Sequence, residues 1–504
     1  MKTLLKTTRK TLDDYWFLFL ISLACFAVHM IANANYGFHR DELQFISDSR
    51  HLAGGFVAYP PVTAIMGFLA RTLFGESLVA YRVFSALAHA AILFVAGLIA
   101  FDLGGKRFAA ALSAVACASS PVLFFSGSVL MYVVYDYFWW ALTAYFLIRV
   151  LKGDPRQWIG VGVSAGFGMM TKYSIVFLVI SMAFAILVLP ERKHFFNRYF
   201  LAGVALGLAI FSPNLVWLIR NDFITFDFLK HIHTRDIAWG RAEGFLGDQL
   251  SDCVGYAAVP LALAGAWFLA TRRELARFRA IPIWTVAVIV LFAVMKGRGY
   301  YTGALYVPLV AAGSVLVSRM AEGGRLRKLA RNAIAVFFAV SAIATAAITI
   351  PLAPVGSRWF NVLVSLNDGF TEQFGWEELA ADVAGVRDSL PESERESFGI
   401  FAGNYGEAGA LEFYGRQYGL PKVMCCTNSF YDRGYDLREP SVIVVVGVDR
   451  ADLSGFFGSV EVVAHSRNAY GFANEETSWH KEIYLCRKPN FTWSEFWKQH
   501  RSFG

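Results

Sequence analysis

The sequence predicts a polytopic α-helical membrane protein with a small α/β domain after the membrane-spanning part. Of its 504 residues, 56% are hydrophobic and only 17% are charged, and the mean hydropathy is +0.45. These values exceed what a soluble surface tolerates. Apolar runs of bilayer-spanning length, roughly 17–25 residues, recur from Tyr15 to about Ile350 and then cease. We therefore expect a membrane domain over residues 1–350 and a soluble domain over residues 351–504.

The apolar runs predict about eleven spanning helices. In chain order they cover residues 15–35, 81–101, 108–125, 133–150, 158–170, 174–189, 199–219, 254–270, 280–295, 301–318 and 332–350. The segment Met1–Lys10 before the first run is basic, and no small-residue cleavage site follows it. We expect a retained first helix there and not a removed signal peptide.

Basic residues occupy every second connection between the apolar runs, which predicts that those connections face the cytoplasm. The clusters are Lys2/Lys6/Arg9/Lys10, Lys106/Arg107, Arg149/Lys152/Arg156, Arg192/Lys193/Arg198, Arg272/Arg273/Arg277/Arg279 and Arg319/Arg325/Arg327/Lys328/Arg331. The stretch 158–189 has a basic loop on each side, so we expect it to form a short hairpin with Thr171–Tyr173 at its tip. The N-terminus is then cytoplasmic, and the odd number of crossings places residues 351–504 on the periplasmic side.

Charge and cysteine content exclude some other classes. The net charge is +7, but the basic residues lie in short clusters between apolar runs, so we expect no nucleic-acid partner. The six cysteines show no paired CxxC spacing and predict neither a zinc site nor a disulfide scaffold. Cys425, Cys426 and Cys486 fall in the soluble part. They could form one disulfide there or remain as free buried thiols.

The predicted outer segments differ from the inner ones. The first outer loop, 36–80, is polar and rich in aromatic residues, Pro and Gly, and its apolar stretch 61–75 is expected to lie as a helix in the membrane interface. The loop 220–252 carries two histidines, His231 and His233, whose i, i+2 spacing does not predict a metal site. The soluble part has two helical patterns, Trp376–Ser389 and Glu407–Gln417, and two β-branched runs, Ser441–Val448 and Ser459–Ala464.

The adjacent carboxylates Asp41 and Glu42 are the sharpest chemical feature, because they follow the first span at the predicted outer face. One carboxylate can act as a general base on a hydroxyl group while the other supports it. Acidic residues can equally mark the end of a helix in water. Asp136 lies among aromatic residues at the outer start of another span, where an ionisable residue is costly and indicates function, an ion pair or a water-filled position.

Three cations, Lys172, Lys296 and Arg298, lie on the same predicted outer face, against the usual bias of positive charge towards the cytoplasm. They could stabilise the charge that develops on a leaving phosphate, or reach towards lipid headgroups. Together they indicate an anionic substrate that enters from the bilayer. Tyr300 and Tyr301 follow them and could anchor the interface or line a sugar or lipid pocket.

These motifs, in this order, resemble the bacterial branch of the dolichyl-phosphate-mannose-protein mannosyltransferase family, whose relatives add aminoarabinose or galacturonic acid to lipid A or core sugars. The resemblance covers essentially the whole chain. Its motifs are Asp41-Glu42, Tyr59-Pro60-Pro61, Gly168-Met-Met-Thr-Lys-Tyr173, Lys296-Gly-Arg-Gly-Tyr-Tyr301 with Pro308, Phe374-Gly-Trp-Glu-Glu-Leu379, Asn404-Tyr-Gly-Glu-Ala408 and Tyr470-Gly-Phe-Ala-Asn-Glu-Glu476.

The resemblance implies a type C glycosyltransferase fold, a polyprenyl-phosphate sugar donor and inversion of the anomeric centre. It implies Asp41 as the general base with Glu42 as its partner, Asp136 as the second acidic position, and Lys172 and Lys296 in the motifs that meet the donor phosphate. We group Arg298 with these cations. Arg40, Tyr59, Tyr300 and Tyr301 join Asp136 as the predicted lining of the substrate cavity.

One departure from the family pattern concerns the residues before the double proline. Many bacterial members have an acidic residue or His there, and aminoarabinose transferases have Glu-Lys-Pro, whereas this chain has Ala58-Tyr59-Pro60-Pro61. The departure argues against aminoarabinose as the sugar and against a metal site that depends on this residue. No cofactor follows from the sequence, and a divalent metal ion stays an open alternative.

The sequence as a whole predicts an inverting glycosyltransferase of the bacterial inner membrane. It would move a sugar from a polyprenyl-phosphate donor to a periplasmic glycan or lipid, such as lipopolysaccharide or a cell-surface polysaccharide. A protein O-mannosyltransferase is the alternative among enzymes. A lipid or polysaccharide transporter without catalysis is the alternative outside them, although the paired halves with broken helices that are common in transporters are not seen.

Overall fold

The computed structural model describes residues 2–320 and 324–504, so Met1 of the basic N-terminal segment lies outside the described residues. The chain forms two compact units. Unit 1 comprises the described parts of Met1–Asn33, Arg82–Trp217 and His233–Ile350. Unit 2 comprises Ala34–Tyr81, Leu218–Ile232 and Pro351–Gly504. The join at residues 350 and 351 coincides with the predicted domain boundary, but unit 2 also takes in the first outer loop and part of the second.

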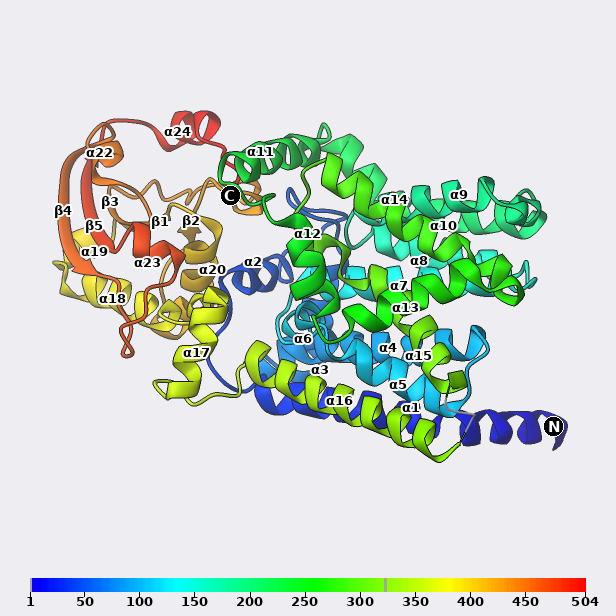
Figure 1. Ribbon diagram of the computed structural model, residues 1–504. Helices are drawn as coiled ribbons and strands as arrows, with labels where there is room; N and C mark the ends of the chain where they lie inside the picture. Colours follow the sequence, from blue (N-terminus) through cyan, green and yellow to red (C-terminus); the bar gives the residue numbers. More distant parts are fainter. Residues whose placement is uncertain (1, 321–323) are drawn as a thin grey trace. The chain divides into compact units, whose positions relative to one another are not determined.

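Unit 1 is helical, and Figure 1 shows its apolar helices running alongside one another. Its principal helices are α1 (Lys2–Ala32), α4 (Leu78–Asp102), α5 (Arg107–Cys117), α6 (Pro121–Gly127), α7 (Tyr132–Leu151), α8 (Gln157–Met169), α9 (Ile175–Leu187), α10 (Arg198–Arg220), α13 (Val259–Thr271), α14 (Ala280–Val294), α15 (Val307–Met320) and α16 (Arg325–Thr349). Shorter turns connect them: η1 (Pro190–His194), α12 (Phe245–Asp248), the π-helix η2 (Gln249–Val254), η3 (Arg273–Phe278) and η4 (Gly299–Tyr306). Helix α11 (Ile224–Ala238) contributes to both units.

Every predicted span overlaps a helix of unit 1, so the membrane-protein class is confirmed. Among the described residues, five helices are long and apolar enough to cross a membrane, and seven if each of two bent helix pairs is one span. Two further predicted spans match the shorter apolar helices α9 and α14. The number of eleven crossings stays a prediction. The stretch 158–189 is broken at 170–174 into α8 and α9, each of 13 residues, about 20 Å at the helical rise.

Glycines bring helices of unit 1 into close contact. A Cβ atom on Gly162 of α8 would lie 2.0 Å from the carbonyl oxygen of Gly203 on α10, and one on Gly166 would lie 2.9 Å from that of Gly207. Small residues at matching positions are the usual means of close helix packing in membranes. The other faces of α10 carry exposed Leu and Ile side chains, as expected of a helix that contacts lipid.

Unit 2 is an α/β domain, as predicted. Its five strands are β1 (Phe398–Ala402), β2 (Val423–Met424), β3 (Val442–Val446), β4 (Phe457–His465) and β5 (Glu482–Pro489), in the order β2-β1-β3-β5-β4. β1 pairs in parallel with β2 and β3, whereas β5 runs antiparallel to β3 and β4. The predicted helix over Trp376–Ser389 is α18, and the two β-branched runs are β3 and β4. The second predicted helix is α20 (Tyr405–Tyr414) followed by η6 (Gly415–Tyr418).

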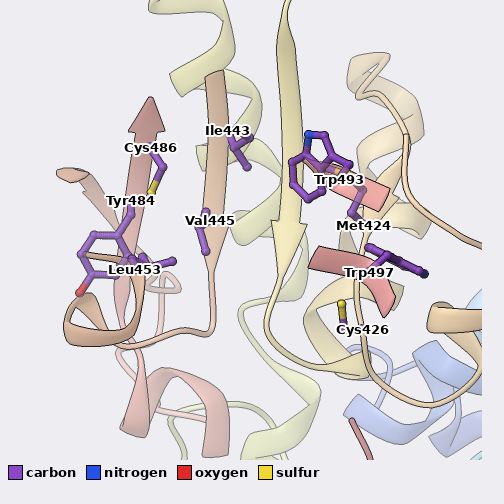
Figure 2. Close-up of a cluster of buried hydrophobic side chains, with 9 residues drawn as sticks. All are labelled: Met424, Cys426, Ile443, Val445, Leu453, Tyr484, Cys486, Trp493 and Trp497. Atoms are coloured by element: carbon purple, nitrogen blue, oxygen red, sulfur yellow. The ribbon is translucent and has the colours of Figure 1, made fainter. Parts of the chain in front are cut away.

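The remaining helices of unit 2 are short. They are α17 (Arg358–Leu366), η5 (Asp368–Gln373), α19 (Glu392–Arg395), α21 (Ser429–Asp432), α22 (Arg450–Leu453), α23 (Glu475–Trp479) and α24 (Trp493–Gln499). Figure 2 shows one core of this unit, where side chains of β3 and β5 pack with two tryptophans of α24, Trp493 and Trp497. Cys426 and Cys486 belong to this core, and all six cysteines of the chain are free and buried. Free thiols, one of the two predicted alternatives, are therefore observed.

The first outer loop folds onto the soluble part of the chain. It forms α2 (Arg40–Asp48) and α3 (Val62–Phe74), the latter over the predicted interfacial stretch. The hydroxyl of Tyr36 donates to the carbonyl oxygen of Ala353 at 2.6 Å. A Cβ atom on Gly409 of α20 would lie 2.8 Å from the Leu43 carbonyl of α2, so this glycine allows the two helices to touch. The loop thereby places α2 against α20.

Candidate active site

Helix α2 begins with a capping box that separates the two predicted catalytic carboxylates. The N-cap residue is His39, whose Nδ1 accepts from the backbone N–H of Asp41 at 3.2 Å. In return, the backbone N–H of His39 donates to Glu42 Oε2 at 2.8 Å. Such reciprocal bonds satisfy the free donors at a helix start. Glu42 is fully buried, and the geometry gives it a structural function in this cap, whereas the side chain of Asp41 is 35% exposed.

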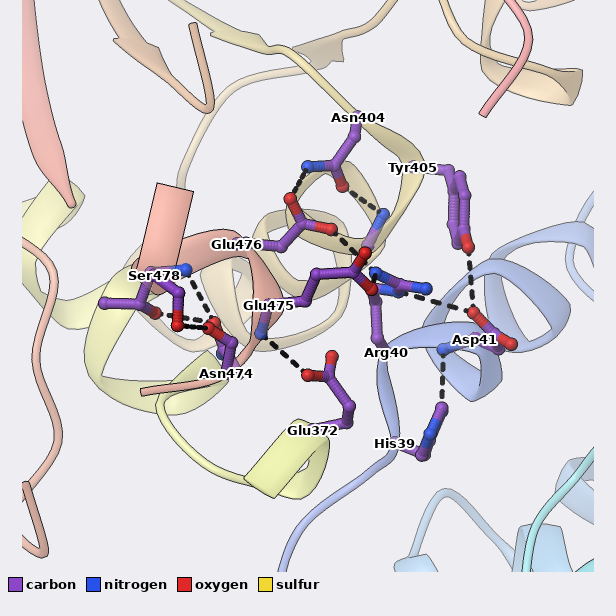
Figure 3. A network of polar contacts seen from close by, with 12 residues as sticks. His39, Arg40, Asp41, Glu372, Asn404, Tyr405, Asn474, Glu475, Glu476 and Ser478 are labelled. Carbon is purple, nitrogen blue, oxygen red and sulfur yellow. Dashed lines mark hydrogen bonds and ion pairs between the residues drawn. The ribbon is translucent and has the colours of Figure 1, made fainter. Parts of the chain in front are cut away.

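The carboxylate of Asp41 is held by two residues of unit 2. The hydroxyl of Tyr405, the first residue of α20, donates to Asp41 Oδ1 at 2.9 Å. Arg40 Nε approaches the same oxygen at 3.5 Å, and the Arg40 guanidinium lies 5.6 Å from the centroid of the Tyr405 ring. Figure 3 shows these three side chains meeting at the start of α2. Asp41 keeps Oδ2 and part of its surface accessible to a reactant.

Acidic side chains on the other side of Arg40 balance its charge. Arg40 Nη1 forms an ion pair with Glu475, and it lies 3.2 Å from Glu476 Oε1. Asn404, the N-cap of α20, donates from Nδ2 to Glu476 Oε2 at 2.6 Å. The network in Figure 3 therefore ties α2, α20 and α23 together. Arg40 was predicted to line the substrate cavity, and the structure shows that its positive charge is already neutralised within unit 2.

The electrostatics of this network distinguish Asp41 from its acidic neighbours. Burial opposes ionisation of Asp41, but the Arg40 guanidinium, His39 and the Tyr405 hydroxyl outweigh it and lower the pKa of the carboxyl. Burial raises the pKa of Glu372 to about 7, against the attraction of Arg40, and raises the pKa of Glu407 well above its usual value. Asp41 is therefore ionised at neutral pH and is able to accept a proton.

A second group of predicted residues meets in unit 1. Lys172 lies in the turn between α8 and α9, with Nζ 3.6 Å from the centroid of the Tyr301 ring. The rings of Tyr132 and Tyr300 lie 4.9 Å and 5.3 Å from the same atom. Three electron-rich rings around an ammonium group form a cage that stabilises the positive charge. The interpretation of Tyr300 and Tyr301 as pocket residues gains support from this cage.

Asp136 stands beside this cage, at the start of α7. Its Oδ2 accepts from the Ser174 hydroxyl at 2.7 Å and its Oδ1 from Trp140 Nε1 at 3.0 Å. The side chain is buried, with a residue exposure of 1%, and it interacts electrostatically with Lys172. The structure thus brings together Asp136, Lys172 and the two tyrosines of the predicted site.

The other two predicted phosphate ligands have different environments. Arg298 forms two hydrogen bonds with Asp236, from Nε and from Nη2, both at 2.6 Å. This bidentate pair neutralises the charge of Arg298. Lys296 is exposed and has a left-handed backbone, with φ of 50°. Of the three cations, Lys172 alone is therefore both enclosed by aromatic rings and adjacent to a buried acid.

Tyr59 requires a correction. It was predicted to line the substrate cavity, but it is 2% exposed and lies in the core of unit 2. Its hydroxyl donates to Asp48 Oδ2 at 2.6 Å, and its ring packs against Phe45 and Phe56. Packing explains the position of this side chain, because a buried phenol needs an acceptor inside the core.

Sequence reasoning missed the partners of Asp41. Tyr405, Glu475 and Glu476 were noted only as parts of motifs in the soluble domain, without a role. The sequence did hold one indication of these residues. Asn404 and Asn474 are N-caps, each directly before a helix, and an N-cap fixes the position of the side chains that follow it. Tyr132, the third ring around Lys172, was not singled out.

Comparison with known proteins finds a similarity over part of the chain. Residues 58–217 match the family model described as dolichyl-phosphate-mannose-protein mannosyltransferase. Over 207 residues the chain is 26% identical to the lipid A galacturonosyltransferase RgtD of Rhizobium johnstonii. That alignment covers 40% of this chain and 41% of the relative, so the chain spans less than half the length of the curated relative it matches.

Solved structures share the fold. ArnT from Cupriavidus metallidurans, bound to undecaprenyl phosphate, aligns with a TM-score of 0.62 at 15% identity, over 93% of this chain and 98% of that one. The Archaeoglobus fulgidus oligosaccharyltransferase aligns with a TM-score of 0.51 at 11% identity, over 82% and 64%. The chain therefore shares the fold of these two proteins, and the matched family model agrees with the predicted resemblance.

Proposed function

We propose that this chain, as a relative of the dolichyl-phosphate-mannose-protein mannosyltransferases, transfers a sugar from a polyprenyl-phosphate donor to a glycan or lipid acceptor with inversion. The observation that carries the proposal is the environment of Asp41. It is an ionised, partly exposed carboxylate whose orientation is fixed by Tyr405 and by the cap of α2. A base held in one orientation is what deprotonation of an acceptor hydroxyl requires.

In the proposed reaction, Asp41 takes the proton from an acceptor hydroxyl. The hydroxyl oxygen forms a bond to the anomeric carbon as the bond from that carbon to the phosphate oxygen breaks. The electron pair of the broken bond leaves with polyprenyl phosphate, and attack from the face opposite the phosphate inverts the centre. Glu42 takes no part in the proton transfer in this proposal, because its carboxylate is buried in the helix cap.

Lys172 is the proposed partner of the donor phosphate. Its charge is desolvated by tyrosine rings and is therefore effective against a phosphate whose negative charge increases as the bond breaks. Phosphate is an adequate leaving group once its charge is stabilised, so a general acid is not obligatory. Lys296 and Arg298 have secondary roles at most in this proposal. Lys296 is exposed to solvent, and Arg298 is bound by Asp236.

An apolar pocket in unit 1 supports a donor with a long isoprenoid chain. The pocket has a volume of about 790 Å³, and α9 and α14 supply most of its lining, including Ile180, Phe184 and Val290. Aromatic contacts continue from these two helices towards the Lys172 cage, because Phe292 of α14 packs against both Phe177 of α9 and Tyr301. A phosphate at Lys172 and an apolar tail along α9 and α14 would match this distribution of charge.

The relatives support the donor class and the location. One structural relative was solved with undecaprenyl phosphate, and the curated relative acts on lipid A, as their names state. We propose the same setting for this chain: the bacterial inner membrane, with the N-terminus in the cytoplasm and residues 351–504 in the periplasm. The acceptor would be lipopolysaccharide or a cell-surface polysaccharide.

Transfer of radiolabelled sugar from polyprenyl-phosphate donors to membrane glycans tests the proposal, with purified protein in lipid nanodiscs. Asp41→Asn keeps the shape of the side chain and removes the base, so transfer should fall about 10²- to 10⁴-fold. Glu392→Gln, at an exposed acid of unit 2, is the matched control and should behave as wild type.

Three outcomes would change the proposal. Wild-type transfer by Asp41→Asn would remove the assigned base. Transfer to a polypeptide in preference to glycans would favour the protein O-mannosyltransferase. Labelled lipid that crosses vesicle membranes, with no transfer from any donor, would favour the transporter.

A further inference from the structure

Three metal-binding side chains converge inside unit 1, in a region that the proposed reaction does not use. Cys25 and His29 lie four residues apart on α1 and therefore share one face of that helix. His89 reaches them from α4. Their residue exposures are 8%, 0% and 0%, and a possible ligand atom of each lies within 4.8 Å of the other two.

Two of the three distances between the ligand atoms are close to those of a tetrahedral site. His29 Nε2 lies 2.8 Å from His89 Nδ1, and Cys25 Sγ lies 3.4 Å from His89 Nδ1. Zinc bonds of ordinary length hold two nitrogens about 3.3 Å apart and a nitrogen and a sulfur about 3.6 Å apart. Each of these two pairs would have to separate by only about half an ångström or less to accept the ion.

One polar atom of the cluster has no hydrogen-bond partner. A neutral imidazole has one acceptor nitrogen and one donor nitrogen. His89 Nδ1 lies within hydrogen-bonding distance of both His29 Nε2 and the Cys25 thiol. Within the described part of the chain, the other ring nitrogen, His89 Nε2, is buried and has no hydrogen-bond partner. Unpaired polar groups in a buried position are costly.

A second interaction fixes the orientation of one ligand. His29 Nδ1 lies 2.9 Å from the hydroxyl oxygen of Ser128. When Nδ1 donates to that oxygen, the lone pair of Nε2 faces the centre of the cluster, which is the usual arrangement of a metal-binding histidine. Phe124 and Gly127 of α6 cover the cluster, since a Cβ atom on Gly127 would lie 2.8 Å from His29 Nε2.

We propose that Cys25, His29 and His89 form a zinc site that fastens α1 to α4. A thiolate and two imidazoles are a donor set that zinc prefers, and its fourth position would be taken by water or another small ligand. The Cys25 proton is lost on binding, and the ion accepts the lone pairs of the Cys25 thiolate, His29 Nε2 and His89 Nδ1. None of the three ligands takes part in the proposed transfer reaction, so the site can exist whether or not that reaction occurs.

Metal analysis of the purified full chain tests this proposal. Protein from zinc-supplemented cells, washed with a weak chelator, should retain about one zinc per chain, as a three-ligand site predicts. His89→Gln and Cys25→Ser should lose most of it. His233→Gln, at an exposed histidine of α11, and Cys117→Ser, at a buried cysteine of α5, are the matched controls and should keep it. Ser128→Ala should weaken zinc affinity about 10- to 100-fold.

Cobalt substitution keeps the test independent of folding defects. Protein loaded with Co²⁺ should show both the visible bands of a tetrahedral ion and the near-ultraviolet band of a thiolate bound to cobalt. Cys25→Ser should lose the thiolate band while the protein elutes as wild type in gel filtration. Wild-type protein without zinc or cobalt, or a thiolate band that survives Cys25→Ser, would overturn the proposal.

Discussion

The hydroxyl of Tyr405 donates a hydrogen bond of 2.9 Å to Oδ1 of Asp41, a residue 364 positions earlier in the chain. The bond joins the first outer loop to the start of α20 within unit 2. It stabilises the ionised form of Asp41 and leaves the other carboxylate oxygen for a reactant. In the reaction that we propose, Tyr405 would act through Asp41, as a positioning residue.

Replacing Tyr405 by Phe should move the acid side of the pH profile. The hydrogen bond lowers the pKa of Asp41, so its loss raises that pKa and transfer should fail at a higher pH than in wild type. A hydrogen bond to a charged group, of about 1.5–3 kcal/mol, corresponds to roughly 1 to 2 pH units. The measurement is transfer rate against pH. Tyr470→Phe, at an exposed ring of unit 2, should leave the profile unchanged, and an unshifted profile for Tyr405→Phe would contradict the positioning role.

Substitution of Lys172 should lower the rate of transfer much more than the same substitution of Lys296. Lys172→Met removes the caged charge, so kcat/KM for the polyprenyl-phosphate sugar should fall about 10²- to 10³-fold. Lys296→Met removes an exposed charge of the same type and should stay close to wild type. Initial rates over a range of donor concentrations check both. Equal losses in the two variants would mean that the aromatic cage gives Lys172 no special role.

The ion pair between Arg298 and Asp236 should stabilise the folded chain. Arg298→Met removes the bidentate partner of the buried Asp236 carboxylate and leaves it only the longer contacts to Arg235 and Arg241. The loss should be up to about 3 kcal/mol, and Asp236→Asn added to it should recover much of it. Thermal unfolding of the single and double variants provides the measurement. If Arg298 instead bound the donor phosphate, Arg298→Met would keep its stability and raise KM, and the second substitution would restore nothing.

Glu372 should make the stability of unit 2 depend on pH. Burial raises its pKa in the folded chain from 4.5 to about 7, so the folded state binds the proton more tightly than the unfolded state. The stabilisation is complete below about pH 4.5 and is lost as the pH rises through about 7, by up to roughly 3 kcal/mol. One carboxylate oxygen, Oε2, is buried without a hydrogen-bond partner in the described structure, which is consistent with a protonated group.

Glu372→Gln is neutral at every pH and keeps an oxygen for the backbone N–H of Glu475, which Glu372 Oε1 accepts at 2.7 Å. Unfolding temperatures of the full chain should therefore fall more steeply in wild type than in the variant between pH 4.5 and pH 7. Parallel curves for the two proteins would show that Glu372 is ionised in the folded state at neutral pH.

Local patterns predicted the secondary structure well where one signal dominated. The helix over Trp376–Ser389 and the strands β3 and β4 were found from periodicity and β-branched runs. The strands β1 and β5 were not singled out. β1 contains a glycine, and β5 mixes apolar residues with Arg487 and Lys488, so neither shows a clear alternation, and pairing with neighbouring strands determines both.

The sequence by itself determined the membrane-spanning class and the α/β character of the C-terminal part, and it singled out Asp41 and Lys172 as candidate site residues. These features depend on hydropathy, charge and short motifs, which are properties of neighbouring residues. Only the tertiary structure decided that Glu42 caps α2, that Tyr59 is core, and that Tyr405 holds Asp41. The physical reason is that the burial and hydrogen-bond partners of a side chain come from segments far away in sequence, and packing alone brings those segments together.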